Sequence, residues 1–131
     1  IVVISGGPDQ TYTVTNNLYY RAVMGYKTGC CFWVMNDRAK LTVDYNLYYI
    51  PENYKGTIGW VHGVTPDRVR ELAEWRNLTG FDEHGSVGQP QFVDPAAGDF
   101  RLKPGSPGEH AASDGGPVGL REPPPTGGRS P

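Results

Sequence analysis

The residues best suited to acid–base chemistry lie around a polar turn that follows an apolar run. Arg38 and Lys40 come after the run 31–35, and Asp44 lies four residues beyond Lys40. Enzymes that cleave acidic sugars by elimination need a basic side chain to remove a proton beside a carboxylate, often with a cation to neutralise that carboxylate. Arg38, Lys40 and Asp44 are therefore the candidates for catalysis. Their spacing is not diagnostic, and the alternative is a solvated turn between strands.

The other titratable residues form no recognised motif. Glycoside hydrolysis needs two carboxyl groups about 5–9 Å apart across a groove. The acidic residues that could supply them are Asp44, Glu52, Asp82 and Glu83, and no pair is marked by its spacing. Asp82 follows Gly80 closely, and we expect it to hydrogen-bond its own backbone in a loop. The three histidines are too far apart in sequence for a ligand motif, so the residues predict no metal site and no cofactor.

Aromatic residues indicate a different chemistry, the binding of sugar rings. The segments Val14–Tyr20 and Val43–Tyr49 align at an offset of 29 residues, with Val, Asn, Leu and both Tyr matched. Adjacent tyrosines point to opposite faces of a strand, so one Tyr of each pair faces outward. On neighbouring strands about 4.8 Å apart, outward rings form a ladder suited to sugar stacking. The predicted carbohydrate-binding residues are Tyr19, Tyr20, Tyr48, Tyr49 and Trp60; the alternative is that loops cover these rings.

The composition limits the fold and the class of partner. The chain has 131 residues, enough for one domain, with 18 Gly, 12 Pro and 15 aromatic residues. This composition favours a turn-rich β domain over a helical bundle or a disordered chain. No apolar run approaches 18 residues, so we expect no membrane span. A net charge of −2 with scattered Lys and Arg argues against nucleic-acid binding.

The repeat predicts the architecture that must position these side chains. Short strands repeating at this interval, with a third strand at 30–35, are typical of a solenoid in which each unit packs on its neighbours. Asn residues at the turns would hydrogen-bond the backbone of the next unit. We therefore predict an all-β, parallel β-helix of few coils; its right-handed form is implied by the resemblance described below. The alternatives are an antiparallel meander and a β-sandwich with divergent repeats.

The predicted organisation has three parts. Residues 1–50 form the coils, residues 51–115 form a loop, one helix and terminal capping strands of the same domain, and residues 116–131 form a tail rich in Pro and Gly. The helix is predicted at 66–78, with Thr65 as N-cap, Pro66 at the first helical position and Gly80 ending it. The strand 1–4 carries no charge and is left as an open edge. We expect further coils upstream or a homo-oligomer through this strand.

From Asp44 onward the sequence resembles the C-terminal region of right-handed parallel β-helix proteins of the pectate-lyase-like superfamily. The matching segments are 44–49, the helix with Leu72, Glu74 and Trp75, then 79–82, 84–86, 89–95, 98–102 and 104–107. The departures are Gly108, Glu109 and His110, where relatives continue into another strand, and the Pro-rich tail. The resemblance implies the last coils and cap of a β-helix.

The resemblance also implies a functional class. It implies a secreted or cell-surface protein that binds or processes polysaccharide or oligosaccharide, with catalysis of the polysaccharide lyase or glycoside hydrolase type on coils upstream or absent. A calcium ion is implied by the resemblance alone. The alternative function is a non-catalytic structural or adhesive end module that mediates assembly.

Overall fold

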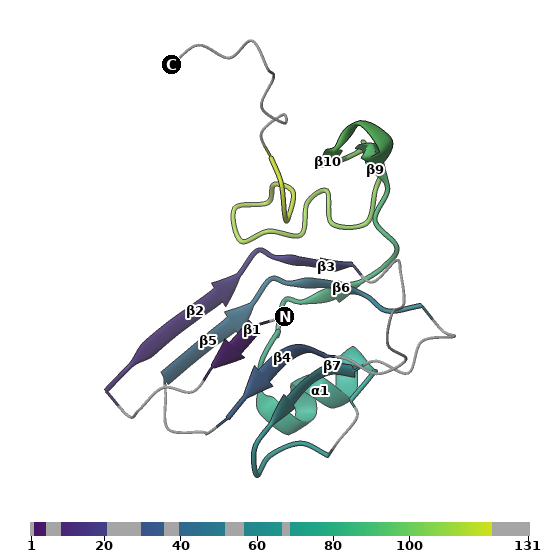
Figure 1. Cartoon of the computed structure of the whole chain (residues 1–131). Helices are drawn as coiled ribbons and strands as arrows, with labels where there is room; N and C mark the ends of the chain where they lie inside the picture. The colour runs from purple at the N-terminus through teal and green to yellow at the C-terminus, as the bar shows by residue number, and fades with distance from the viewer. Residues whose placement is uncertain are drawn as a thin grey trace.

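The structure is a computed structural model that describes residues 2–4, 9–20, 30–35, 40–51, 57–66 and 69–121. The strands are short and the chain has one α-helix within these ranges (Figure 1). The elements are β1 (Val2–Ile4), β2 (Thr11–Thr15), β3 (Leu18–Tyr20), β4 (Cys30–Val34), β5 (Lys40–Asp44), β6 (Leu47–Tyr49), β7 (Thr57–Val61), α1 (Leu72–Thr79), β8 (Ser86–Val87), β9 (Phe92–Asp94), the 3-10 helix η1 (Pro95–Ala97) and β10 (Asp99–Leu102).

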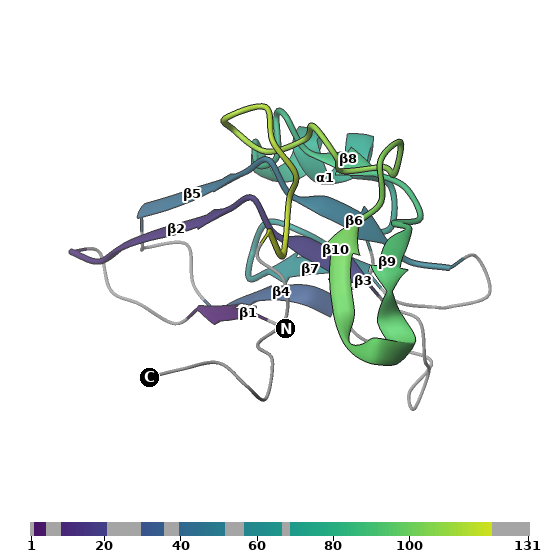
Figure 2. The ribbon, with the colours of Figure 1, turned by 90° about the horizontal axis from the view of Figure 1, so that it is seen from above.

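The strands form four small sheets. Parallel pairing gives the orders β1-β4-β7, β2-β5 and β3-β6-β8, and β9 pairs with β10 antiparallel. Figure 2 shows the β9–β10 hairpin beside the end of β3, with the segment after β10 returning over β6. Tyr20 of β3 and Phe92 of β9 are in ring contact, which ties the hairpin to the sheet of β3.

The repeat predicts the strand register correctly. Leu18, Tyr19 and Tyr20 pair in parallel with Leu47, Tyr48 and Tyr49, and β2 pairs with β5 at the same offset. The predicted role of asparagine is also confirmed, because Asn46 Oδ1 accepts a hydrogen bond from the backbone N–H of Asn17 at 3.1 Å, and Asn46 Nδ2 donates to the carbonyl of Val14 at 3.1 Å. Identical side chains at equal spacing thus align the two units.

The prediction of a parallel β-helix is wrong at the level of the fold. Within the described residues the sheets hold two or three strands each, and they do not continue as a stacked solenoid. The β2–β5 sheet ends after its second strand, β8 has only two residues, and the last pairing in sequence is the antiparallel β9–β10. The physical reason is that the repeat occurs only twice. After Tyr49 no third Leu-Tyr-Tyr segment exists to extend the sheets.

The helix begins later than the sequence predicts. It starts at Leu72 rather than at residue 66, and it ends at Gly80, whose φ of 73° lies in the left-handed region as expected for a C-terminal glycine. Thr65 does not cap this helix. Its hydroxyl accepts a hydrogen bond from the Val61 N–H at 2.8 Å, so the residue closes the turn after β7 instead.

The main core lies between the sheets and the helix. Trp75 of α1 is fully buried against Phe32, with ring centroids 6.1 Å apart, and Gly59 of β7 leaves the space it fills. A Cβ atom at Gly59 would lie 2.6 Å from Trp75 Cη2, closer than real Cβ atoms approach other heavy atoms. The glycine is therefore required by the close approach of the helix.

A second, smaller core holds the C-terminal segment. Val118 is fully buried with Leu47 and Ala112, and Leu18 and Leu102 pack around them. The predicted tail 116–131 thus contributes a core residue in its described part, because the segment folds back over the outer face of β3 and β6. Residues 122–131 of that prediction lie outside the described residues.

Candidate functional site

Tyr20 and Tyr49 are the outward tyrosines of the repeat. Their rings stack with centroids 5.5 Å apart and an angle of 20° between the planes. Tyr20 is 38% exposed, and Tyr49 is half-buried. Both lie on the same face of the sheet as Leu18 and Leu47, because side chains two residues apart in a strand share a face. The C-terminal segment covers the two leucines and leaves the tyrosines at its border.

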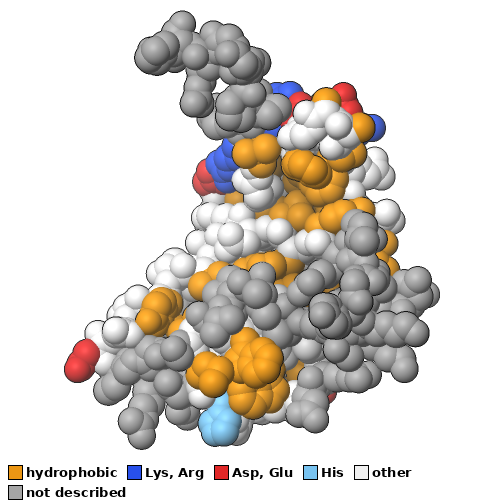
Figure 3. Space-filling view, in the orientation of Figure 1, with side chains coloured by type: hydrophobic (Ala, Val, Ile, Leu, Met, Phe, Trp, Pro, Cys, Tyr) orange, Lys and Arg blue, Asp and Glu red, His pale blue; other side chains and the backbone are white. Residues whose placement is uncertain are grey.

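The β9–β10 hairpin adds two aromatic rings to this pair. Phe92 meets Tyr20 edge to face, with centroids 5.3 Å apart and planes at 88°. Phe100, which is 48% exposed, meets Phe92 at 5.4 Å and 79°. Figure 3 shows hydrophobic side chains gathered around β9 and β10 and continuing toward β3. We call Tyr20, Tyr49, Phe92 and Phe100 the tyrosine surface; its two phenylalanines were missed because they lie outside the repeat.

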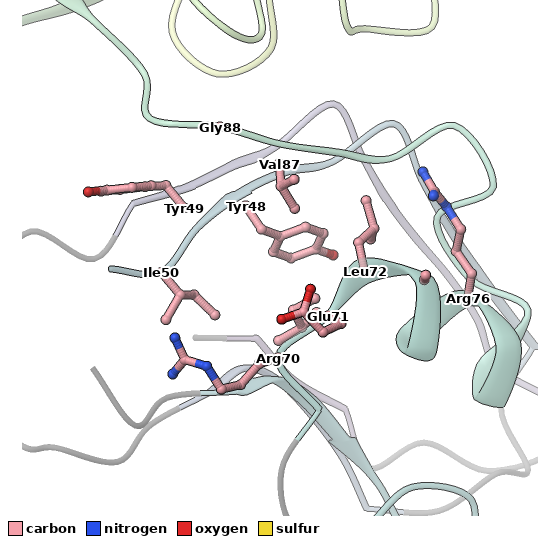
Figure 4. A pocket seen from close by; sticks show the side chains of 11 residues that line it. Tyr48, Tyr49, Ile50, Arg70, Glu71, Leu72, Arg76, Val87 and Gly88 are labelled. Atoms are coloured by element: carbon pink, nitrogen blue, oxygen red, sulfur yellow. The ribbon is translucent and has the colours of Figure 1, made fainter. Parts of the chain in front are cut away.

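A hollow of about 520 Å³ borders Tyr49. Most of its lining residues are apolar or aromatic, and Arg70 and Glu71, from the segment before α1, add charged side chains. In Figure 4 Tyr49 lies at one side of this hollow, and the carboxylate of Glu71 points into it between Tyr48 and Arg70. The half-buried Arg70 donates to the carbonyl of Pro51 at 3.2 Å. Charged donors and acceptors beside a ring are the groups that orient a polyhydroxylated ligand.

Tyr19 and Tyr48 face the core and not the solvent. Their rings stack at 5.3 Å with planes 8° apart, and Tyr48 is 1% exposed. Burial raises the pKa of both phenols well above their usual range, and the neighbouring Cys31 and Asp82 raise the pKa of Tyr19 further. Both phenols therefore stay neutral, and of the four tyrosines predicted to bind sugar only the outward two present a surface.

Asp82 is the buried polar centre beneath these rings, and its role differs from the prediction. Its Oδ2 accepts hydrogen bonds from Tyr48 Oη at 2.7 Å and Trp75 Nε1 at 3.0 Å, and its Oδ1 accepts from Asn46 Nδ2 at 3.0 Å. Its carboxylate therefore bonds other elements rather than the backbone of its own loop. Asn17, Asn46 and Asp82 form a ladder across successive units, in which the side chain of each later residue accepts from the one before.

Trp60 belongs to a separate aromatic surface on the β1-β4-β7 sheet. It pairs in register with Trp33, and the two rings lie 5.5 Å apart at 66°. The ring centroids of His62 and Trp60 also lie 5.5 Å apart. Trp33 and Met35 are 42% and 45% exposed. Figure 3 shows hydrophobic side chains beside a histidine over β4 and β7. The structure thus does not bring Trp60 together with the tyrosine surface.

The predicted catalytic residues are not brought together among the described residues. Lys40 and Asp44 stand at opposite ends of β5, about 13 Å apart at the usual rise of a strand. Arg38 lies outside the described residues. Asp44 instead holds the loop after the helix: its Oδ1 accepts from the N–H groups of Tyr45 and His84 at 2.8 and 2.7 Å, and its Oδ2 lies 2.8 Å from His84 Nδ1.

The Asp44–His84 contact predicts a pH-dependent stability. The hydrogen bond to Asp44 raises the pKa of His84 above 6.5, so its stabilising effect is complete below that pH and is lost as pH rises through the raised value. Partial burial raises the pKa of Asp44, but the hydrogen bonds from His84 and Tyr45 outweigh it and lower the pKa below 3.8. The effect of Asp44 is therefore present above pH 3.8 and lost as pH falls through the lowered value.

We expect the pair to stabilise the fold most between these limits, and thermal unfolding followed by circular dichroism across pH 3 to 9 (about the range spanned by the two groups) measures it. In His84→Ala the decline in Tm above pH 6.5 should be weaker than in the unsubstituted chain. His110→Ala, at an exposed histidine 3.6 Å from Glu109, is the matched control. Equal pH profiles for His84→Ala and the unsubstituted chain would contradict this prediction.

Within the described ranges, no three His, Cys, Asp or Glu side chains converge to hold a metal ion. The helix of the same ranges is too short to cross a membrane.

Comparison with protein families, with curated proteins and with solved structures finds no match to this chain.

Proposed function

We propose that this protein binds polysaccharide or oligosaccharide through the tyrosine surface and the adjoining hollow. The observation that carries the proposal is the pair of outward stacked tyrosines, joined by the half-buried ring of Phe92 and the exposed ring of Phe100 from a separate hairpin. Tyr20 and Phe100 are exposed and Tyr49 and Phe92 are half-buried, and aromatic side chains that gather at the surface commonly mark a binding site. Rings that combine an apolar face with a polar tip suit sugars, which are apolar on one face and carry hydroxyl groups at the edge.

The geometry supports a chain-like ligand more than a single compact one. Tyr20 and Phe92 stand nearly perpendicular, as do Phe92 and Phe100, so the surface presents both ring faces and ring edges along its length. The hollow beside Tyr49 adds Arg70 and Glu71 as partners for hydroxyl groups. The proposal concerns binding and does not extend to bond cleavage, since the candidate catalytic residues Lys40 and Asp44 stand apart.

Substitution of the two outward tyrosines tests the proposal. Tyr20→Ala and Tyr49→Ala should each weaken binding of a polysaccharide by about twofold to tenfold, the loss expected for one ring contact of 0.5–1.5 kcal/mol. Affinity gel electrophoresis against xylan, a mixed-linkage glucan and polygalacturonate measures this, after a glycan array has identified the best of the three.

Two controls locate the binding surface. Val93→Ala changes an exposed apolar residue next to Phe92 without removing a ring and should leave binding unchanged. Trp33→Ala removes an exposed ring from the other aromatic surface and should also have little effect. If Trp33→Ala abolishes binding while both tyrosine variants retain it, the ligand occupies the tryptophan pair and the proposed surface is wrong. Absence of binding to every glycan by the folded chain would contradict the function itself.

A further inference from the structure

The strand β2 forms one edge of a two-stranded sheet. Among the described residues it pairs only with β5, and Figure 1 shows it on the outside of β5. The other edge of that sheet, on β5, has a hydrogen-bond partner, because the N–H of Asp82 donates to the carbonyl of Val43 at 2.7 Å. Exposed edge strands are commonly protected from pairing with another chain by a charge, a proline or a bulge. β2 has none of these protections, since its sequence is Thr-Tyr-Thr-Val-Thr and its register with β5 is regular.

The outward hydrogen-bonding groups of β2 can be assigned from its pairing with β5. The N–H of Lys40 donates to the carbonyl of Gln10 at 2.9 Å. In a parallel pair every second residue directs its backbone groups to the neighbour. Tyr12 and Val14 therefore bond β5, while Thr11, Thr13 and Thr15 direct their N–H and C=O groups away from the sheet.

The sequence of β2 is complementary to itself in the antiparallel direction. A two-fold axis at Thr13 would place Thr13 opposite its own copy, Thr11 opposite Thr15, and Tyr12 opposite Val14. The three threonines are the residues whose backbone groups point outward, so they would form the hydrogen-bonded pairs of the new ladder. On the other face, the half-buried Tyr12 would meet a half-buried Val14 of the second copy, an aromatic and β-branched pair that stabilises antiparallel strands.

We propose that a second copy of this chain binds along β2, so that the two sheets join as β5-β2-β2-β5 across a two-fold axis. The interface is isologous, since the same strand serves both copies. This site differs from the predicted oligomer contact at residues 1–4. β1 has three residues, whereas β2 has five. In an antiparallel pair of two β1 strands, Val2 would lie opposite Ile4, so the end residues would differ, whereas in β2 both end residues are threonine.

Light scattering coupled to size-exclusion chromatography tests the proposal with the full chain. The unsubstituted chain should show a dimer whose fraction rises with concentration. Thr13→Lys places two ammonium groups next to each other at the axis and should raise the dissociation constant about tenfold or more. The matched control is Thr42→Lys, because Thr42 is the exposed residue directly opposite Thr13 in the inner strand β5; it should retain the dimer. Thr13→Val, which keeps a β-branched side chain, should do the same.

Each outcome decides for or against the interface. A monomer at every concentration up to about 1 mM overturns it, and so does a dimer that persists in Thr13→Lys. Equal weakening by Thr42→Lys and Thr13→Lys places the contact elsewhere and also overturns it. Circular dichroism confirms that the variants fold. If Thr13→Lys does not, Thr11→Lys at the other exposed position of β2 replaces it and must lower the dimer fraction.

Discussion

Asp82→Asn is expected to lower the free energy of unfolding by about 3 kcal/mol. Asp82 is completely buried, and its carboxylate accepts from Tyr48 Oη, Trp75 Nε1 and the side-chain and backbone nitrogens of Asn46. Asparagine has the same size but carries one NH2 group in place of an acceptor oxygen. Whichever way the amide turns, donors on one side of it face another donor and lose their partner.

Asp82→Asn tests the loss of hydrogen bonds without adding backbone strain. Asp82 has a φ of 54°, a left-handed conformation that asparagine adopts as readily as aspartate. Denaturation in urea, followed by tryptophan fluorescence, measures the change in unfolding free energy. Asp114→Asn is the control, since Asp114 also accepts from several donors but at an exposed site; we expect its effect on the unfolding free energy to be much smaller, because exposed ion pairs contribute little to stability. An Asp82→Asn variant as stable as the unsubstituted chain would show that the carboxylate is not required.

The strand register could be predicted from sequence because it depends on the repeat. A matched Leu-Tyr-Tyr at equal spacing requires one register, since a shift of a single residue would move both inner tyrosines to the outside. The same alternation predicts correctly that one tyrosine of each pair faces outward. Gly80 was predictable as a helix end because few other residues adopt its conformation.

The end of the sheets and the position of the helix were not predictable from local patterns. Thr65 and Pro66 have the sequence pattern of a helix start. In the structure, however, the Thr65 hydroxyl accepts a hydrogen bond from the Val61 N–H. This bond closes the turn after β7, which the local sequence pattern does not predict. The β-helix interpretation extended a pattern seen twice to the whole domain. The later segments lack that pattern, and they pair in short or antiparallel ladders instead.

The tyrosine surface could likewise be predicted only in part. Tyr20 and Tyr49 follow from the repeat, whereas Phe92 and Phe100 join them only through the fold of the β9–β10 hairpin. Trp60 was selected for its residue type alone, and the sheet order places it with Trp33 on a different sheet. One signal in the sequence was available for Asp82: Asn17 and Asn46 precede the two Leu-Tyr-Tyr segments, and an acidic residue is a natural acceptor for a third rung of that ladder.

Trp75→Ala is expected to destabilise the chain by about 3–5 kcal/mol, a large share of the 5–15 kcal/mol that stabilises most domains. Trp75 is fully buried, contacts Phe32 and Phe81, and donates to Asp82. Its removal leaves a cavity above Gly59, which has no side chain to fill it, and leaves Asp82 with one donor fewer. The helix loses its main contact with β7, so we expect either a strongly lowered urea midpoint or a chain without a cooperative transition.

Trp33→Ala is the matched control for this prediction. Trp33 is the same residue type on the neighbouring strand β4, but it is 42% exposed and lies in a tryptophan pair at the surface. Its truncation should cost about 1 kcal/mol. Trp75→Phe separates packing from hydrogen bonding, because it keeps an aromatic ring in the space above Gly59 and removes only the N–H donor and part of the volume; we expect an intermediate loss. If Trp33→Ala destabilised the chain as much as Trp75→Ala, the core would not be centred where the helix meets β7.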